Sequence, residues 1–306
     1  MCQGFLLKKS FGFSLRLDRT NIKINYVKEM ITLGRRVRSP VVDGLFYPED
    51  TAGVLAFMRK IGLKRGKGGR ARAIVAPHGA WEISGDLAGA AFSSAGGRTG
   101  KDFPSRVVVM GPIHDKQAEG LFLTNSHSFS TPLGDIPVDL EIIDALESFS
   151  PLFEIDDIPH LKEHSLEVLL PFIKYCFPET SIVPILMGKP NKAVVNALAS
   201  ALKEVLALVM ENTLLVISFN ISVHHGKEEA MDMAWECFKL LGDRNCDELC
   251  KMLQSGRIVS CGGGLVTALL QSGLVDTMNP KLVSSSLQSA QGEDGRTVYY
   301  GAFSFN

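Results

Sequence analysis

The chain has 306 residues, of which 45% are hydrophobic and 21% charged, an ordinary composition for a globular protein with a large core. Lys and Arg number 32 against 33 for Asp and Glu, so no basic excess favours nucleic-acid binding. No apolar run approaches the ~20 residues that a helix needs to cross a bilayer, which argues against a membrane-spanning protein.

The cysteines favour a reducing compartment. There are six of them without any Cys-x-x-Cys spacing, and a chain of this length forms a core without disulfides. We therefore expect free thiols and a cytoplasmic protein. Cys246 and Cys250 stand at helical i, i+4 spacing, which could support a metal. Because nothing chelating lies near them in sequence, buried or half-buried helix positions are favoured.

Residues 1–36 differ from the rest of the chain. Their basic residues far outnumber Asp18 and Glu29, and their apolar residues follow no clear period. We expect a basic N-terminal extension that is disordered or loosely docked, with Met30 as an alternative start. No repeat or low-complexity linker interrupts residues 37–306, which predicts a single domain there.

Within that domain, apolar runs typical of strands alternate with amphipathic stretches typical of helices. Strands are expected at 73–78, 106–110, 182–187, 213–218 and 297–305, and a hairpin within 120–140. Helices are expected at 54–61 with a Thr51 cap, 84–92, 140–146, after a Ser165 cap, and at 192–210, 226–241, 246–253 and 265–270. The alternation predicts an α/β fold with a mainly parallel central sheet and helices on both faces.

Polar side chains follow several of these strands. His78 and His114 come just after the first two strands, and Asn220 follows the strand at 213–218. In open α/β sheets, ligands bind beyond the carboxyl ends of the strands. We therefore expect one pocket that contains both imidazoles and the Asn220 amide.

Cys261 is the thiol that best completes such a pocket. It precedes Gly262 and a predicted helix, and amides at a helix start stabilise a thiolate. With His78 and His114 it would suit zinc, copper or iron and leave one coordination position open. The alternative is that Cys261 is a small buried residue before a tight turn.

Glu163 and His164 offer a second imidazole and carboxylate. They can act as a general base or hold a metal ligand in place, or they can cap a helix and form a surface ion pair. A serine hydrolase is discounted because no Gly-x-Ser-x-Gly turn surrounds any serine. Hydrolysis by a Cys261–His114 pair lacks an identifiable carboxylate to orient the histidine.

The order of short motifs along residues 37–306 resembles the Memo family, which in bacteria and archaea is component B of the AmmeMemoRadiSam system. The motifs that carry the resemblance are Phe46-Tyr-Pro, Ala76-Pro-His, Gly111-Pro-Ile-His, Pro132-Leu-Gly-Asp, Glu163-His-Ser-Leu-Glu and Ser218-Phe-Asn.

The resemblance implies a fold similar to class III extradiol dioxygenases. It also implies a metal pocket whose two histidines and cysteine match His78, His114 and Cys261, with iron or copper as the cofactor and zinc as a further option. Radical-SAM and AMMECR-type proteins are the implied partners, and a phosphotyrosine peptide is an implied ligand.

The chain departs from the family pattern after the fourth strand. Where the family has an aspartate and then a histidine, this sequence has Asn220 and Val223, and His224 would substitute only if the backbone shifted by one residue. An amide can neither act as a base nor balance a metal's charge. Two hypotheses follow: a metal-dependent redox or dioxygenase-like enzyme with Glu163, His164 and Asn220 at its site, or a non-catalytic binding protein.

Overall fold

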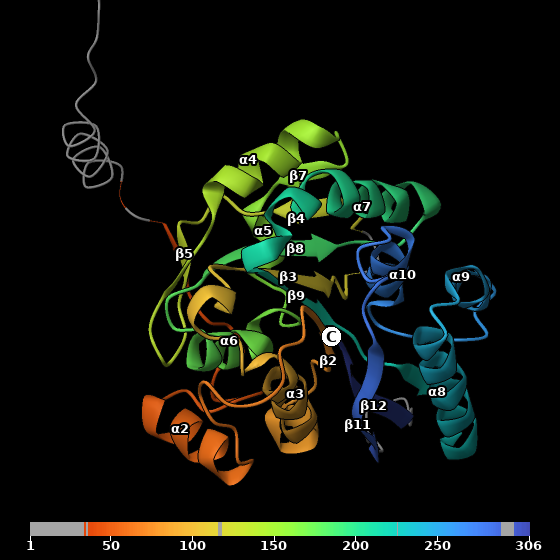
Figure 1. Cartoon of the computed structure of the whole chain (residues 1–306), viewed down its shortest axis with the longest axis horizontal. Coiled ribbons are helices and arrows are strands. Elements are labelled where there is room, and N and C mark those ends of the chain that lie inside the picture. The colour runs from red at the N-terminus through yellow and green to blue at the C-terminus, as the bar shows by residue number, and fades with distance from the viewer. Residues whose placement is uncertain (1–33, 35, 116–117, 225, 289–296) are drawn as a thin grey trace, which may run out of the picture. The chain divides into compact units, whose positions relative to one another are not determined.

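The structure is a computed structural model that describes residues 34, 36–115, 118–224, 226–288 and 297–306. Arg36–Asn306 form one compact unit (Figure 1). The predictions for the basic extension and for Met30 lie outside the described residues.

A mixed central sheet dominates this unit. Its strands are β2 Ala73–Ala76, β3 Arg106–Pro112, β4 Leu121–Leu123, β7 Phe153–Ile155, β8 Ser181–Met187, β9 Thr213–Ser218, β10 Ser222–His224, β11 Pro280–Gln288 and β12 Thr297–Phe305. Within the described chain they follow the order β10-β12-β2-β9-β3-β8-β4-β7, with β11 also paired to β12. The central strands β2, β9, β3 and β8 run parallel, and antiparallel pairs lie on either side of them.

Burial shows why these central strands read as continuous apolar runs. Every residue of β2 and β9 is buried, and β3 and β8 are open only at their ends. A strand that is buried at successive positions must be covered on both faces of the sheet. The predicted α/β class, a largely parallel sheet flanked by helices, is therefore confirmed (Figure 1).

A smaller sheet contains β1 Val37–Arg38, β5 Ser128–Phe129 and β6 Ile136–Pro137. β1 pairs parallel to β5, and β5 pairs antiparallel to β6. The predicted hairpin is the β5–β6 pair, whose turn is closed by a hydrogen bond of 2.9 Å from Gly134 N to Thr131 O.

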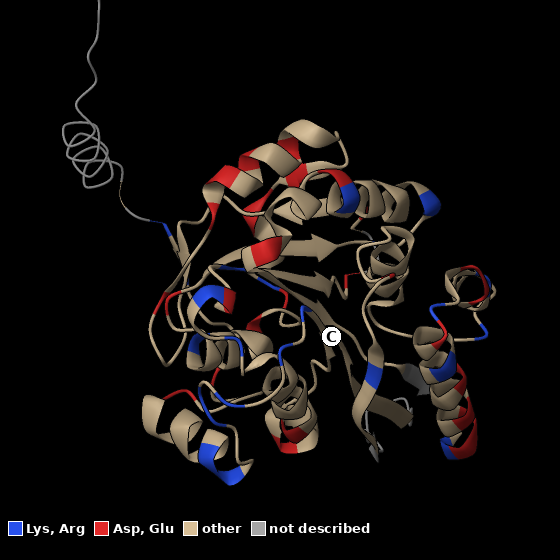
Figure 2. Cartoon of the chain, viewed as in Figure 1, with Lys and Arg blue, Asp and Glu red and all other residues tan. Residues whose placement is uncertain are grey.

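The helices connect and cover the strands. The α-helices are α2 Thr51–Lys60, α3 Trp81–Ala95, α4 Leu140–Phe149, α5 Asp157–His160, α6 Leu170–Cys176, α7 Lys192–Glu204, α8 Lys227–Gly242, α9 Cys246–Gln254 and α10 Gly263–Gln271. The 3₁₀ helices are η1 Gly100–Asp102, η2 Glu167–Leu169 and η3 Leu206–Asn212. Charged residues lie mainly on the helices and loops, while the central strands are almost free of them (Figure 2).

Both predicted helix caps are wrong. α2 begins at Thr51, but the cap is the preceding Asp50, whose carboxylate accepts a hydrogen bond of 2.8 Å from Gly53 N. Ser165 does not cap a helix, because its hydroxyl donates to Pro112 O at 2.7 Å and so ties its segment to the end of β3. Sequence spacing indicated neither the Asp50 carboxylate as the partner of Gly53 N nor the Pro112 carbonyl as the partner of the Ser165 hydroxyl.

Two further elements differ from expectation. The single helix predicted at 192–210 is divided at Val205 into α7 and η3, which are bent by 55°. β11 was not predicted, because its central Ser284-Ser-Ser286 run gives no apolar alternation. It lies beside β12 with a register shift between Leu282 and Ser284.

None of the described helices is by itself long and apolar enough to span a membrane, and only the bent α7–η3 pair reaches that length and hydropathy when the two are counted together.

Candidate metal centre

The central sheet brings three of the predicted site residues to one edge. β2, β9 and β3 are consecutive neighbours and run parallel, so their carboxyl ends meet. His78, Asn220 and His114 each stand two residues beyond the end of one of these strands. Their proximity therefore follows from the strand order.

Cys261 reaches the same edge through a single backbone bridge. Asn220 N donates to Cys261 O at 3.0 Å, and Cys261 N donates to Asn220 O at 3.3 Å. Gly262 follows with φ +97°, and a Cβ there would lie 2.5 Å from Ser218 O. Only glycine fits that position, so the turn into α10 holds Cys261 against the end of β9.

Two histidines and this cysteine form a group with the geometry of a metal site. The potential ligand atoms of His78, His114 and Cys261 all lie within 4.8 Å of one another. The His78 and His114 ring centroids are 5.3 Å apart, with an interplanar angle of 72°. The structure thus brings together the three residues that the sequence nominated as ligands.

The hydrogen bonds of His78 define which ring nitrogen is free. Ser218 Oγ donates to Ser165 O at 2.7 Å and lies 2.7 Å from His78 Nδ1. Because the hydroxyl hydrogen is already used, Nδ1–H must be the donor of the second bond, and Nε2 carries the lone pair. Nε2 is buried and has no hydrogen-bond partner among the described residues. Burial lowers the pKa of His78 well below its ordinary value, which keeps the ring neutral.

Glu163 holds the second imidazole. Its Oε2 accepts from His114 N at 2.7 Å, and its Oε1 lies 2.9 Å from His114 Nδ1. Burial alone would raise the pKa of Glu163, but the hydrogen bond and charge of His114 outweigh it and lower this pKa to about 2. The ionised oxygen accepts from Nδ1–H, which directs His114 Nε2 toward Cys261. With only 5% of its side chain exposed, Glu163 is not part of a surface ion pair.

The partners of His114 favour the protonated form of its ring. Burial opposes protonation, but hydrogen bonds to Cys261 and Glu163 overcome it and raise the pKa of His114 to about 10. Metal ligation requires the neutral ring, so an ion that enters the site must displace this proton.

His164 stacks on His114. The two ring centroids are 4.7 Å apart with an interplanar angle of 14°, and His164 Nδ1 lies 3.3 Å from Glu163 Oε1. Burial lowers the pKa of His164, and the neighbouring His114 lowers it further, against the charge of Glu163. His164 is thus a neutral imidazole beside an ionised carboxylate, an arrangement that can accept a proton from the pocket.

Asn220 contacts two of the three candidate ligands. Its Oδ1 accepts from His78 N at 3.2 Å, and its main chain pairs with Cys261. These contacts use a neutral acceptor and need no titratable group. The side chains of Val223 and His224, the other departures from the family pattern, lie outside the described residues.

Other residues considered from sequence lie elsewhere. Glu167 faces away from the histidines and pairs with Arg38. Cys246 and Cys250 are half-buried positions of α9, as expected. Among the described residues they belong to no group of metal-ligand geometry. Glu163 was expected from sequence to be able to hold a metal ligand in place, and it contacts His114. Ser218, the partner of His78, was missed, because it is distant from His78 in sequence and forms no recognisable spacing with it.

A cavity of about 1300 Å³ opens beside the candidate ligands. His114, Asn220 and Cys261 line it together with residues that follow β8 and residues from α9 and α10. The volume is ample for a small organic molecule, and sites of this kind commonly combine apolar walls with a few polar groups.

Comparison with known families decides the assignment. The family model described as Memo-like protein matches residues 38–302. The chain belongs to the Memo-like family. A MEMO1 family protein of Thermotoga neapolitana is 30% identical over 249 residues, covering 78% of this chain and 88% of that protein. A MEMO1 family protein of Methanobrevibacter smithii is 28% identical over 252 residues, covering 77% and 87%. One from Thermococcus onnurineus is 32% identical over 197 residues, covering 62% and 66%.

Proposed function

We propose that this Memo-like protein binds a metal ion through His78 Nε2, His114 Nε2 and Cys261 Sγ. The observation that carries the proposal is the buried Nε2 of His78, which has no partner among the described residues. An unpaired buried acceptor is costly, and a metal ion would satisfy it. Both Nδ1 atoms are committed to Ser218 and Glu163, which turns both Nε2 atoms in the direction that metal ligation requires.

Two nitrogens and one thiolate suit iron, copper or zinc, and the family resemblance favours iron or copper. When bound, such an ion would supply redox or Lewis-acid chemistry to a small molecule in the adjacent cavity. Glu163 holds the His114 ring, and His164 is placed to take up a proton. The supported role is therefore metal-dependent redox or dioxygenase-like chemistry on a small organic substrate.

The test is elemental analysis of anaerobically purified protein. We expect about one equivalent of iron, copper or zinc in the wild type, and almost none in His78→Ala or Cys261→Ser. Cys250→Ser is the matched control, because Cys250 lines the same cavity but belongs to no ligand group among the described residues. A wild type without bound metal, and with no tighter affinity than Cys261→Ser, contradicts the proposal.

A second candidate uses the thiol directly. The sequence offered no carboxylate to orient a Cys261–His114 pair, but Glu163 contacts His114 Nδ1 and completes a thiol–imidazole–carboxylate series. Rapid alkylation of Cys261 in chelator-treated protein would favour this candidate. The rapid reaction should be lost in His114→Gln, while the alkylation rate of Cys250 stays unchanged.

A binding-only role remains the third candidate and is favoured by the neutral amide at Asn220. It predicts stable complexes with radical-SAM or AMMECR-type proteins or with a peptide. It also predicts that Asn220→Asp produces no new activity. Oxygen consumption with a catechol-like substrate would contradict it.

A further inference from the structure

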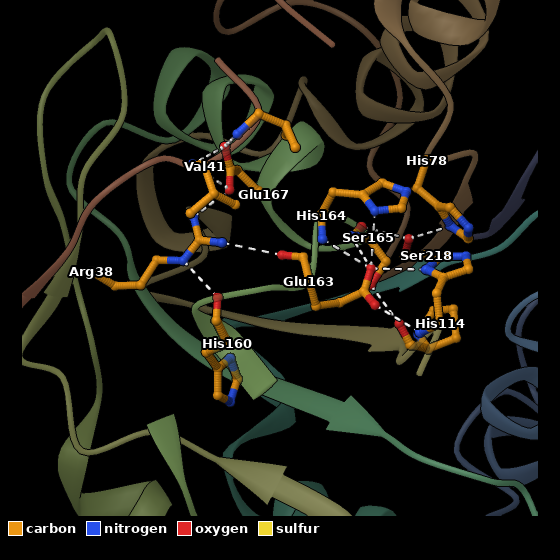
Figure 3. Close-up of polar contacts among 12 residues, drawn as sticks. Arg38, Val41, His78, His114, His160, Glu163, His164, Ser165, Glu167 and Ser218 are labelled. Atoms are coloured by element: carbon orange, nitrogen blue, oxygen red, sulfur yellow. Dashed lines mark hydrogen bonds and ion pairs between the residues drawn. The ribbon is translucent and has the colours of Figure 1, made fainter. Parts of the chain in front are cut away.

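We infer that Arg38 and Glu167 are positioning residues for the candidate metal centre, acting through the segment Glu163–Ser165 that orients both histidine ligands. The inference rests on the proposed function and extends it to a buried ion pair outside the cavity. Figure 3 shows the pair on one side of this segment and His78 and His114 on the other.

Arg38 contacts three acceptors with one guanidinium. Its Nη1 pairs with Glu167 Oε2 at 2.5 Å, its Nε donates to His160 O at 2.9 Å, and its Nη2 donates to Glu163 O at 3.1 Å. The residue is 3% exposed, so these bonds are shielded from water. A planar fork with fixed donor directions defines the relative position of all three acceptors.

Glu167 anchors this fork to the start of the domain. Its Oε1 accepts from Val41 N and Val42 N at 2.9 Å each, and from the Tyr47 hydroxyl at 2.9 Å. Together with Arg38, these bonds join the segment at 38–47 to the segment at 160–167. The Arg38 guanidinium and the Glu167 carboxylate each form several hydrogen bonds, and a buried charge pair is tolerated under this condition.

The clamped segment is the one that holds the imidazoles. Glu163 presents its carbonyl to Arg38 and its carboxylate to His114. Two residues later, Ser165 O receives the Ser218 hydroxyl that in turn contacts His78 Nδ1. A shift of this backbone would therefore displace the partners of both rings at once.

A purely structural brace would lower stability and leave the metal geometry unchanged. A positioning role predicts weaker metal binding and altered coordination even in protein that is fully folded. The Arg106–Asp139 pair provides the comparison. It is mostly buried, with a 2.6 Å contact, but it lies at the start of β3, whereas His114 follows the end of that strand.

The experiment uses full-length protein with Co²⁺ alone as the probe, reading its dissociation constant and its visible absorption. Arg38→Lys keeps the charge but loses the fork, and Glu167→Gln keeps the shape but loses the charge. We expect about tenfold weaker Co²⁺ binding and shifted absorption bands in both variants. Arg106→Lys should melt at a lower temperature but bind Co²⁺ with wild-type affinity and spectrum.

Each outcome is decisive. Wild-type affinity and spectrum in folded Arg38→Lys or Glu167→Gln, with binding still lost in His78→Ala, overturns the positioning role and leaves the proposed function intact. If Arg38→Lys does not fold, Glu167→Gln decides alone. An equal effect of Arg106→Lys on the spectrum also overturns it. Absence of Co²⁺ binding by the wild type overturns both the proposed function and the positioning role.

Discussion

The carboxylate of Glu163 binds His114 at two points at once. One oxygen accepts from the main-chain N–H at 2.7 Å and the other lies 2.9 Å from ring Nδ1. The first bond fixes the position of the His114 main chain, and the second fixes the rotation of its ring. His114 is therefore held in a single orientation although 38% of its side chain is exposed.

Glu163→Gln should weaken metal binding by 10- to 100-fold, roughly the range for losing a group that orients a metal-bound histidine. A glutamine offers one acceptor oxygen where the carboxylate offers two, so its amide group faces a donor. Competition with a chromophoric chelator measures the affinity. Glu154→Gln, at an exposed position of β7, is the control and should bind as the wild type does. Equal affinities in the two variants contradict this role for Glu163.

Ser218→Ala should cost about 2 kcal/mol of unfolding free energy and weaken metal binding about tenfold. The change leaves Ser165 O and His78 Nδ1 without their shared hydroxyl. Ser84→Ala is the matched control, because the Ser84 hydroxyl is buried without a partner in the described chain and its removal should be nearly neutral. Urea unfolding and chelator competition on both variants separate the two serines, and identical losses would contradict the assignment.

Gly262→Ala should destabilise the protein by about 3 kcal/mol, since alanine adds left-handed backbone strain and a clash with Ser218 O. Gly256 has φ +71° and open space around its Cβ position, so Gly256→Ala should cost only about 1 kcal/mol. Thermal unfolding compares them. Metal affinity should fall in the first variant only, because Cys261 adjoins Gly262.

Asn220→Asp should fold and keep the wild-type metal affinity or exceed it, since an aspartate retains the acceptor for His78 N and adds negative charge. Asn220→Leu leaves that N–H unpaired and should cost about 2 kcal/mol. Loss of metal binding in Asn220→Asp would show that the amide group itself is required.

His160 should make the fold acid-sensitive. Burial outweighs its hydrogen bond to Phe122 O and lowers the pKa of His160 to about 4. Between pH 6.5 and 4 the unfolded chain then binds a proton that the native state does not, so stability falls as the pH falls. The loss is on the order of 3 kcal/mol at pH 4 and levels off below that pH. Urea unfolding at pH 7.5, 5.5 and 4.5 should show a shallower pH slope for His160→Gln, and an unchanged slope would refute this.

The parts of the site that follow strands were predictable. The end of a strand is visible in the sequence as the end of an apolar run. Residues that follow neighbouring parallel strands lie at the same edge of the sheet, so His78, His114 and Asn220 could be placed together. Cys261 was nominated from its turn into a helix. Its actual anchor, the bridge to Asn220, has no sequence pattern because it joins single residues 41 positions apart.

The groups that orient the ligands were not predictable in the same way. Glu163 was recognised as a candidate, but its pairing with His114 depends on how two loops approach each other. Ser218 looked like an ordinary strand residue. The side chains of Asp50 and Thr51 can both cap a helix. Which of them does so depends on the backbone geometry, and here it is Asp50.

The bridge between Asn220 and Cys261 also has a consequence for the order of events during synthesis. His78 and His114 leave the ribosome long before the thiol does, and the residues that hold the thiol in place come from both sides of residue 220. The two imidazoles therefore cannot form the complete site before Cys261 has been translated, and an ion held by all three side chains would be captured only after the turn at Gly262 has folded onto the end of β9.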